Sequence, residues 1–267
     1  MIDLKNKRLR ARCSKNNVPI LSNDDIDEAV EELLRDYNPE LLSQPQAVDV
    51  EDFVENYLNL HLRYANLSHD GHILGTTVFE TMKIPLYDEI NKAPYVDVMN
   101  ANTVIIDNSL LPDNREHLFR STMGHEGGHS VCNSAYYLCN YFQYELPLED
   151  KKGRGMSEEE RVGFVQCNKR YIMENIMGSG NKPRKLKTAQ DWLEHQANYF
   201  SASLLMPRAA MNTVLSELKS LPDSTLAEVV SEMFNVSLKS AKIRIGDIRR
   251  SSVNTHSSQP SRQLEFL

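Results

Sequence analysis

Two histidines and a glutamate within five residues carry the clearest chemistry in this sequence. His125, Glu126 and His129 form an HExxH pattern, and on a helix positions i and i+4 share one face. Two imidazoles placed in this way can bind one Zn²⁺ at about 2.0–2.1 Å. Glu126 lies off that line, where its carboxylate can take a proton from a zinc-bound water, whose pKa falls to about 7. The pattern therefore predicts a zinc site with Glu126 as general base.

The residues around the motif argue against a chance match, which is expected in on the order of one in fifty such chains. The motif lies in a predicted helix with apolar Leu118, Phe119 and Met123 upstream. Gly127 and Gly128 stand inside that helix, where each costs roughly 1 kcal/mol relative to alanine. This cost indicates a purpose, and we expect close approach of another backbone.

A catalytic zinc usually has three protein ligands and one open position. The metzincin pattern is excluded, because Cys132 and Ala135 occupy the positions that would need glycine and histidine. The third ligand must therefore come from farther along the chain. The candidate glutamates are Glu145, Glu149, Glu158, Glu174 and Glu194.

Glu194 differs from the other candidates, most of which lie in charged stretches typical of a solvated surface. It belongs to a largely apolar helix predicted over about Ala189 to Met206. One narrow face of this helix can pack onto Gly127 and Gly128 and bring the carboxylate to the metal. That face consists of Glu194, Ala197, Asn198 and Ser201.

Three neighbours of Glu194 are candidates for supporting roles at the site. His195 points about 100° away from Glu194 and suits a surface position better than a fourth ligand. Asn198 can orient a ligand from behind. His195 and Tyr199 are candidates for stabilising an oxyanion. Mn²⁺ and Fe²⁺ stay open beside Zn²⁺, since ligand softness and metal availability decide between them.

The stretches Leu118–His129, Glu194–Phe200 and Leu204–Pro207 together resemble the ImmA/IrrE family of zinc metallopeptidases. Their E-x-Q-A-N-x-F and L-L-M-P elements are more specific than HExxH. The resemblance extends from about Gly71 to Leu218. Two departures are the long stretch between His129 and Glu194, and Gly127, which stands where a larger apolar residue is common.

The resemblance implies a fold and a site. The fold is α+β and zincin-like, with a small antiparallel sheet packed against the HExxH helix and mostly helices elsewhere. The ligands of Zn²⁺ would be His125, His129 and Glu194, with Glu126 as the general base. Family members are typically anti-repressors that cleave a helix-turn-helix transcriptional repressor and so release its genes.

Three functional hypotheses follow from these residues. The first is a metalloendopeptidase that cleaves a helix-turn-helix repressor. The second is a non-catalytic regulator that binds a repressor or DNA through its C-terminal helical region. The third is a zinc hydrolase that acts on short peptides. Sensitivity to Glu126→Gln separates the first from the second.

Element patterns divide the chain into five parts. Apolar residues at helical spacing predict helices after Ser22-Asn23 and Asp49, whereas Leu74–Ile84 and Tyr95–Asp107 contain β-branched runs typical of strands. Further helices are predicted from Pro112, at roughly 158–177, and from Pro207. The parts are a mobile basic arm (1–21), an N-terminal helical segment (22–70), a zincin-like domain (71–219) with an insertion at about 134–188, a helix-turn-helix-like subdomain (220–250) and a disordered tail (251–267).

Charge and composition limit the partners. The formal net charge is −7, which disfavours nucleic-acid binding by the whole surface. Leu226–Ile248 has a mildly basic side with Lys239, Lys242, Arg244, Arg249 and Arg250, but acidic residues dilute it, so DNA binding is the less favoured role. No stretch approaches the roughly 20 apolar residues of a membrane span. We expect a cytoplasmic protein with four free thiols; the sequence leaves the oligomeric state open.

Overall fold

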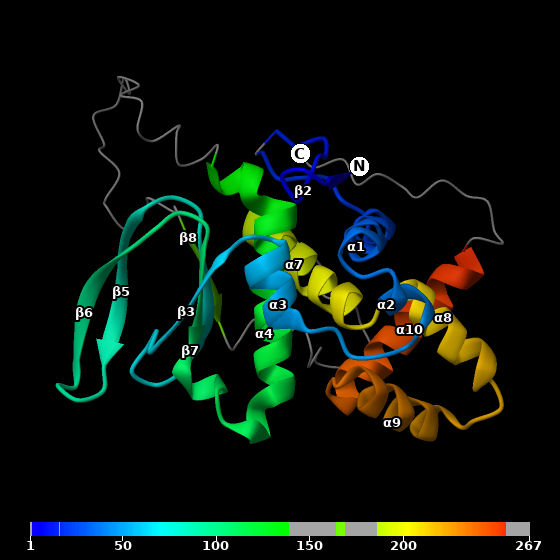
Figure 1. Ribbon diagram of the computed structural model, residues 1–267. Coiled ribbons are helices and arrows are strands. Elements are labelled where there is room, and N and C mark those ends of the chain that lie inside the picture. The colour runs from blue at the N-terminus through cyan, green and yellow to red at the C-terminus, as the bar shows by residue number, and fades with distance from the viewer. Residues whose placement is uncertain (1, 16, 139–163, 169–185, 255–267) are drawn as a thin grey trace.

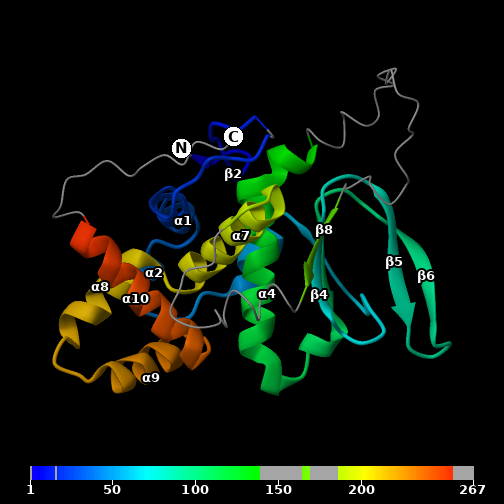
Figure 2. The same ribbon diagram turned by 180° about the vertical axis from the view of Figure 1, so that it is seen from behind.

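The fold places a sheet on one side of a central helix and a group of helices on the other. The computed structural model describes residues 2–15, 17–138, 164–168 and 186–254. In Figures 1 and 2 the central helix α4 (Glu116–Gly128) lies between the strands and the remaining helices, and α7 (Ala189–Leu205) crosses it. The predicted α+β class is confirmed. Within the described residues, every helix is too short or too polar to cross a bilayer.

The main sheet is mixed rather than antiparallel, so this part of the prediction was wrong. Its strand order is β3 (His61–Ala65), β7 (Thr103–Asp107), β4 (Ile73–Val78) and β8 (Phe164–Asn168). β3 runs parallel to β7, and the other two pairs are antiparallel. β3 lies inside the segment 22–70 that the sequence predicts as helical, and nothing in its pattern indicated that it would pair with a strand about forty residues later.

A separate two-stranded ribbon accounts for the other strand signals. Met82–Asp88 (β5) pairs antiparallel with Ala93–Met99 (β6). Each predicted strand stretch therefore divides into two strands that belong to different sheets. Alternation identified the extended backbone correctly, but it carries no information on which strand lies beside which.

The segment between His129 and Glu194 contains a strand where the sequence predicts a helix at roughly 158–177. β8 forms at the centre of that range and pairs antiparallel with β4. The edge of β4 has N–H and C=O groups that need partners, and this tertiary pairing overrides the local pattern. Residues 139–163 and 169–185, which hold the rest of the predicted helix and insertion, lie outside the described part.

The other helices follow the predicted signals closely. Ser22 and Asp25 form a capping box at the start of α1 (Asn23–Tyr37), and the Asp49 side chain caps α3 (Val50–Asp52). Thr188 and Asp191 form a second capping box ahead of α7. The helical elements besides α4 and α7 are α1 (Asn23–Tyr37), α2 (Glu40–Ser43), α3 (Val50–Asp52) with the π-helical turn Phe53–Tyr57, the 3-10 turns Asn108–Leu110 and Asp113–Arg115, the π-helical turn His129–Asn133 that follows α4, α8 (Arg208–Glu217), α9 (Asp223–Phe234) and α10 (Leu238–Asn254).

The N-terminal residues are packed, in contrast to the mobile arm that the sequence suggested. Ile2–Asp3 (β1) and Arg8–Leu9 (β2) pair antiparallel, and Ile2, Leu9 and Leu21 are buried in the main core. These apolar residues are too widely spaced in a polar stretch to give a periodic signal, so only the tertiary structure reveals their burial.

α9 and α10 form the predicted helix–turn–helix, which is built into the core. Asn235 adopts the left-handed conformation at the turn, and the Ser237 hydroxyl accepts a hydrogen bond from the Ser240 N–H. Arg244, which the sequence placed on the basic side, is 1% exposed. Its guanidinium lies 2.5 Å from the Asp27 carboxylate on α1. Helix α10 also continues to residue 254, past the predicted start of the tail.

Glycines let α4 and α7 approach closely. The sequence predicts this for Gly127 and Gly128, and the structure confirms it for Gly128. A Cβ on Gly128 would lie 2.9 Å from the Ala197 carbonyl oxygen, and one on Gly124 would lie 2.8 Å from the Ser201 hydroxyl. Gly127 instead faces Val54 of the π-helical turn, because consecutive residues project about 100° apart around a helix.

Replacing Gly128 by alanine is expected to destabilise the fold by about 1–3 kcal/mol, because the new methyl group meets backbone atoms that cannot rotate away. Gly127→Ala is the matched control. Its methyl group would approach Val54 and Leu58 at 3.3 and 3.4 Å, and the gain in helix propensity offsets this crowding to within about 1 kcal/mol. Chemical denaturation measures both, and equal unfolding free energies would contradict the assigned contact.

Candidate metal centre

Three ligand groups converge where α4 and α7 cross. The ligand atoms of His125, His129 and Glu194 all lie within 4.8 Å of one another. The His125 Nε2 atom is 3.3 Å from Glu194 Oε2, and the His129 Nε2 atom is 3.6 Å from Glu194 Oε1. Each of the three side chains is 1% exposed or less. This buried triad can hold a metal ion.

Searches of protein-family models and of the curated proteins find no match to this chain.

Two asparagines stand behind the imidazoles. Asn198 Oδ1 lies 3.0 Å from His125 Nδ1, the position that the sequence suggested for this residue. Asn133 Oδ1 lies 2.9 Å from His129 Nδ1. An amide oxygen that accepts the Nδ1–H of a ring leaves the Nε2 lone pair for a metal, and the two Nε2 atoms lie 3.0 Å apart. Asn133 was missed, although its position four residues after His129 was a usable signal.

Glu126 is held against the sheet beside the triad. Its Oε2 atom accepts a hydrogen bond of 2.6 Å from the Thr77 hydroxyl on β4. Gly75 on the same strand makes room, because a Cβ there would lie 2.6 Å from Glu126 Oε1. Sequence reasoning missed Thr77 and Gly75, since nothing local indicates which strand faces the motif.

Burial changes the protonation of Glu126. It raises the pKa of this carboxyl to about 8, with the Glu194 charge adding to the effect and His125 and the Thr77 hydrogen bond opposing it. Without a metal the group therefore holds a proton at neutral pH. A carboxyl with a pKa near the working pH is suited to take up and release a proton.

The two other titrating groups have the charges that a metal needs. Burial, assisted by the charge of His125, lowers the pKa of His129 to about 4, so the ring is neutral at pH 7. Burial acts to raise the pKa of Glu194, but the contact with the His125 imidazole and the proximity of His129 outweigh it, so the net shift is downward. Gln190 also donates a hydrogen bond of 2.7 Å to Glu194 Oε1.

Two buried carboxylate oxygens lack hydrogen-bond partners within the described part of the chain, which is what a site that binds a cation would show. Glu126 Oε1 and Glu194 Oε2 have no hydrogen-bond donor among the described residues. Leaving such atoms without a partner costs about 1–3 kcal/mol or more. A divalent cation with a water molecule would satisfy both, and two imidazoles with one carboxylate is a donor set that Zn²⁺ favours.

The remaining candidates lie elsewhere. His195 Nε2 contacts Asn23 Oδ1 at 3.0 Å. The Tyr199 hydroxyl donates to Asp27 and accepts from Arg244, each at 3.0 Å, so it serves the buried ion pair and not an oxyanion. Cys132 is a buried thiol outside the triad. The alternative ligands, which lie outside the described residues, are Glu145, Glu149, Glu158 and Glu174.

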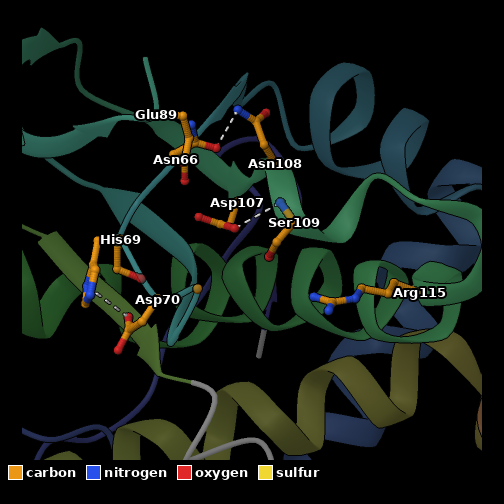
Figure 3. Close-up of a pocket in the computed structure, with 10 residues that line it drawn as sticks. Asn66, His69, Asp70, Glu89, Asp107, Asn108, Ser109 and Arg115 are labelled. Carbon is orange, nitrogen blue, oxygen red and sulfur yellow. Dashed lines mark hydrogen bonds and ion pairs between the residues drawn. The ribbon is translucent and has the colours of Figure 1, made fainter. Parts of the chain in front are cut away.

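A polar pocket of about 430 Å³ lies at the carboxyl ends of β3 and β7 (Figure 3). None of the triad residues line it. Asp107 at its wall accepts hydrogen bonds from the backbone N–H groups of Leu67 and Ser109, and Asn108 donates to Asn66. These hydrogen bonds stabilise the loops around the pocket. The pocket is distinct from the metal centre, because the two share no residues.

The buried carboxyl predicts a pH dependence for the metal-free protein. The pKa of Glu126 rises from 4.5 to about 8 on folding, so the unfolded state has already lost this proton above pH 6.5 while the native state keeps it. Stability therefore falls as pH rises from 6.5 to 8, by about 1–2 kcal/mol. The lowered pKa of His129 has the opposite effect, since it makes stability rise with pH. This rise lies mostly between pH 4 and 6.5, below the range in which Glu126 acts.

Denaturation in the presence of a chelator at pH 6.5, 7.25 and 8 measures this slope. Glu126→Gln should flatten it, because glutamine does not titrate. A slope of the same size in the variant would assign the effect to another group.

Proposed function

We propose that this protein is a zinc-dependent metallopeptidase. The observation that carries the proposal is the buried group of His125, His129 and Glu194 with the Glu126 carboxyl beside it. Zn²⁺, when bound, would act as a Lewis acid that polarises a peptide carbonyl and acidifies water. The resemblance of the motifs to the ImmA/IrrE family supports a zincin-like site of this kind.

The chain's own residues then have distinct tasks. His125 and His129 present neutral Nε2 atoms, and Glu194 supplies the negative ligand. Glu126 takes a proton from water and returns it to the leaving amine, a role that a carboxylate beside the metal ligands can fill. Thr77 holds the other carboxylate oxygen of Glu126 in place, so the general base has one fixed orientation.

The burial of the centre bears on how a substrate enters. All four side chains are 1% exposed or less, so a peptide carbonyl reaches the metal only after a movement of the segments around it. Movements of this kind are common in enzymes and often set the turnover rate. We infer that cleavage depends on opening, which favours a specific protein substrate over any short peptide.

The family resemblance makes a helix-turn-helix transcriptional repressor the proposed substrate. The test is to incubate the zinc-loaded protein with the repressor encoded beside its gene and to analyse the products by mass spectrometry. Glu126→Gln is run in parallel. Cleavage by the wild type alone supports the proposal, and equal cleavage by both proteins would rule out this mechanism.

A non-catalytic regulator is the second candidate, favoured by the closed site and by α10. Lys239, Lys242 and Ile243 lie on the exposed side of that helix, whereas Arg244 ties its other side to the core. This hypothesis predicts regulation that survives Glu126→Gln and is lost in Lys239→Glu/Lys242→Glu. The double substitution is preferable to a truncation, which would expose the core.

A further inference from the structure

Three hydrogen bonds connect a metal-ligating histidine to the N-terminal segment. His129 Nδ1 lies 2.9 Å from Asn133 Oδ1. Asn133 Nδ2 donates to Gln196 Oε1 at 2.7 Å, and Gln196 Nε2 donates to the Pro19 carbonyl oxygen at 2.7 Å. The side chains of His129, Asn133 and Gln196 are 0% exposed. Water therefore does not compete for these bonds.

The Pro19 carbonyl oxygen determines which group donates and which accepts in each of these three hydrogen bonds. A carbonyl oxygen only accepts, so the Gln196 amide must turn its nitrogen toward Pro19 and its oxygen toward Asn133. Asn133 must in turn place its nitrogen toward Gln196 and its oxygen toward His129. The proton on the His129 ring is then held at Nδ1, and the lone pair is held at Nε2.

His125 provides a contrast within the same site. Its Nδ1 atom also faces an amide oxygen, that of Asn198. However, Asn198 Nδ2 is buried with no hydrogen-bond acceptor among the described residues. Nothing beyond Asn198 therefore fixes which way this amide points. The relay, by which we mean the three hydrogen bonds from His129 through Asn133 and Gln196 to Pro19, has no counterpart at His125 in the part of the chain that the structure describes.

We propose that Gln196 and Asn133 are positioning residues that set the tautomer of His129, with their polarity fixed by the Pro19 carbonyl. The N-terminal segment is then part of the metal centre, although it contributes no ligand. This inference rests on the proposed metal site but not on peptidase activity. Loss of such supporting bonds typically lowers metal affinity by about 10–100-fold.

The test measures the tautomer directly in the metal-free protein at pH 7.5. Two-bond ¹⁵N–¹H spectra of ¹⁵N-histidine-labelled protein distinguish a protonated Nδ1 from a protonated Nε2. The wild type should show His129 protonated at Nδ1 alone. Gln196→Met keeps the size of the side chain but removes both hydrogen bonds, so His129 should become a mixture of tautomers and Zn²⁺ affinity should fall about 10–100-fold.

The His125 signals should shift as well, because its Nε2 atom lies 3.0 Å from His129 Nε2, so the control is a substitution elsewhere. Gln46→Met makes the same substitution at an exposed position and should alter neither the tautomer nor the affinity. A folded Gln196→Met protein with His129 still protonated at Nδ1 alone, and with zinc affinity within twofold of the wild type, would overturn the proposal.

A second pair of variants covers the case in which Gln196→Met does not fold. Asn133→Asp keeps an oxygen acceptor for the Nδ1–H and should retain the tautomer, whereas Asn133→Leu should lose it. The same tautomer in both variants would also overturn the proposal. If the wild type binds no zinc, the proposed metal site fails, but the tautomer measured without metal still decides the role of the relay.

Discussion

Glu126→Gln is expected to lower the rate of peptide cleavage by about 10²–10⁴-fold while the protein keeps its metal. Glutamine matches the size of the carboxylate and can still accept the hydrogen bond that Thr77 donates, but it cannot take a proton from water. The site contacts, and hence zinc binding, should be preserved. The measurement is kcat/KM on a cleaved substrate, together with the zinc content per chain.

Glu217→Gln is the matched control for this substitution. It makes the same chemical change on the exposed side of α8 and should leave kcat/KM within twofold of the wild type. A Glu126→Gln protein that holds zinc and cleaves at the wild-type rate would exclude this residue as the general base. A variant that loses zinc as well would point to a structural role instead.

The second large effect concerns the metal itself. Glu194→Ala is expected to weaken zinc binding by more than about 100-fold, because it removes a ligand and not only a supporting contact. Glu194 is also the one negative group among the three ligands, so the variant leaves a divalent charge uncompensated in a buried site. Competition against a chromogenic chelator gives the affinity.

Thermal unfolding gives an independent measurement of the same effect. Zinc at 100 times its Kd should stabilise the wild type by about 2.7 kcal/mol, and the Glu194→Ala melting temperature should not respond to that concentration. Glu228→Ala, an exposed glutamate on α9, should behave as the wild type does. A zinc-dependent rise in melting temperature for Glu194→Ala equal to that of the wild type would remove Glu194 from the ligand set.

The sequence was most informative where function depends on short-range geometry. HExxH on a helix places two imidazoles on one face whatever the rest of the fold does. Ser22, Asp49 and Ser237 cap helices because a side-chain oxygen satisfies N–H groups only a few residues away. These interactions form within a helical turn or two, so they can be predicted without knowing the tertiary structure.

The selection of Glu194 as third ligand needed information on how two helices pack, and the sequence contained that information. Small residues on one face of α7 and a glycine in α4 indicated a close crossing, and Gly128 lies against Ala197 as expected. The failure for Gly127 shows the limit of this reasoning. A glycine signals close approach, but it does not identify the partner.

Strand pairing was the main failure, for a physical reason. Backbone hydrogen bonds between strands are the same for every sequence, so a strand's own residues say little about its neighbours. β3 joining β7 in parallel and β8 adding to β4 were therefore decided by the packing of the whole chain. The contact between Thr77 and Glu126 depends on that pairing and was missed with it.

The sequence by itself determined the ligand types, their spacing and the helices that carry them. Only the tertiary structure decided the environment of those groups. The burial that raises the pKa of Glu126 and the hydrogen bonds that run from His129 to Pro19 join residues from distant parts of the chain. Desolvation and long-range hydrogen bonds are properties of neighbours in space, which a pattern along the chain does not encode.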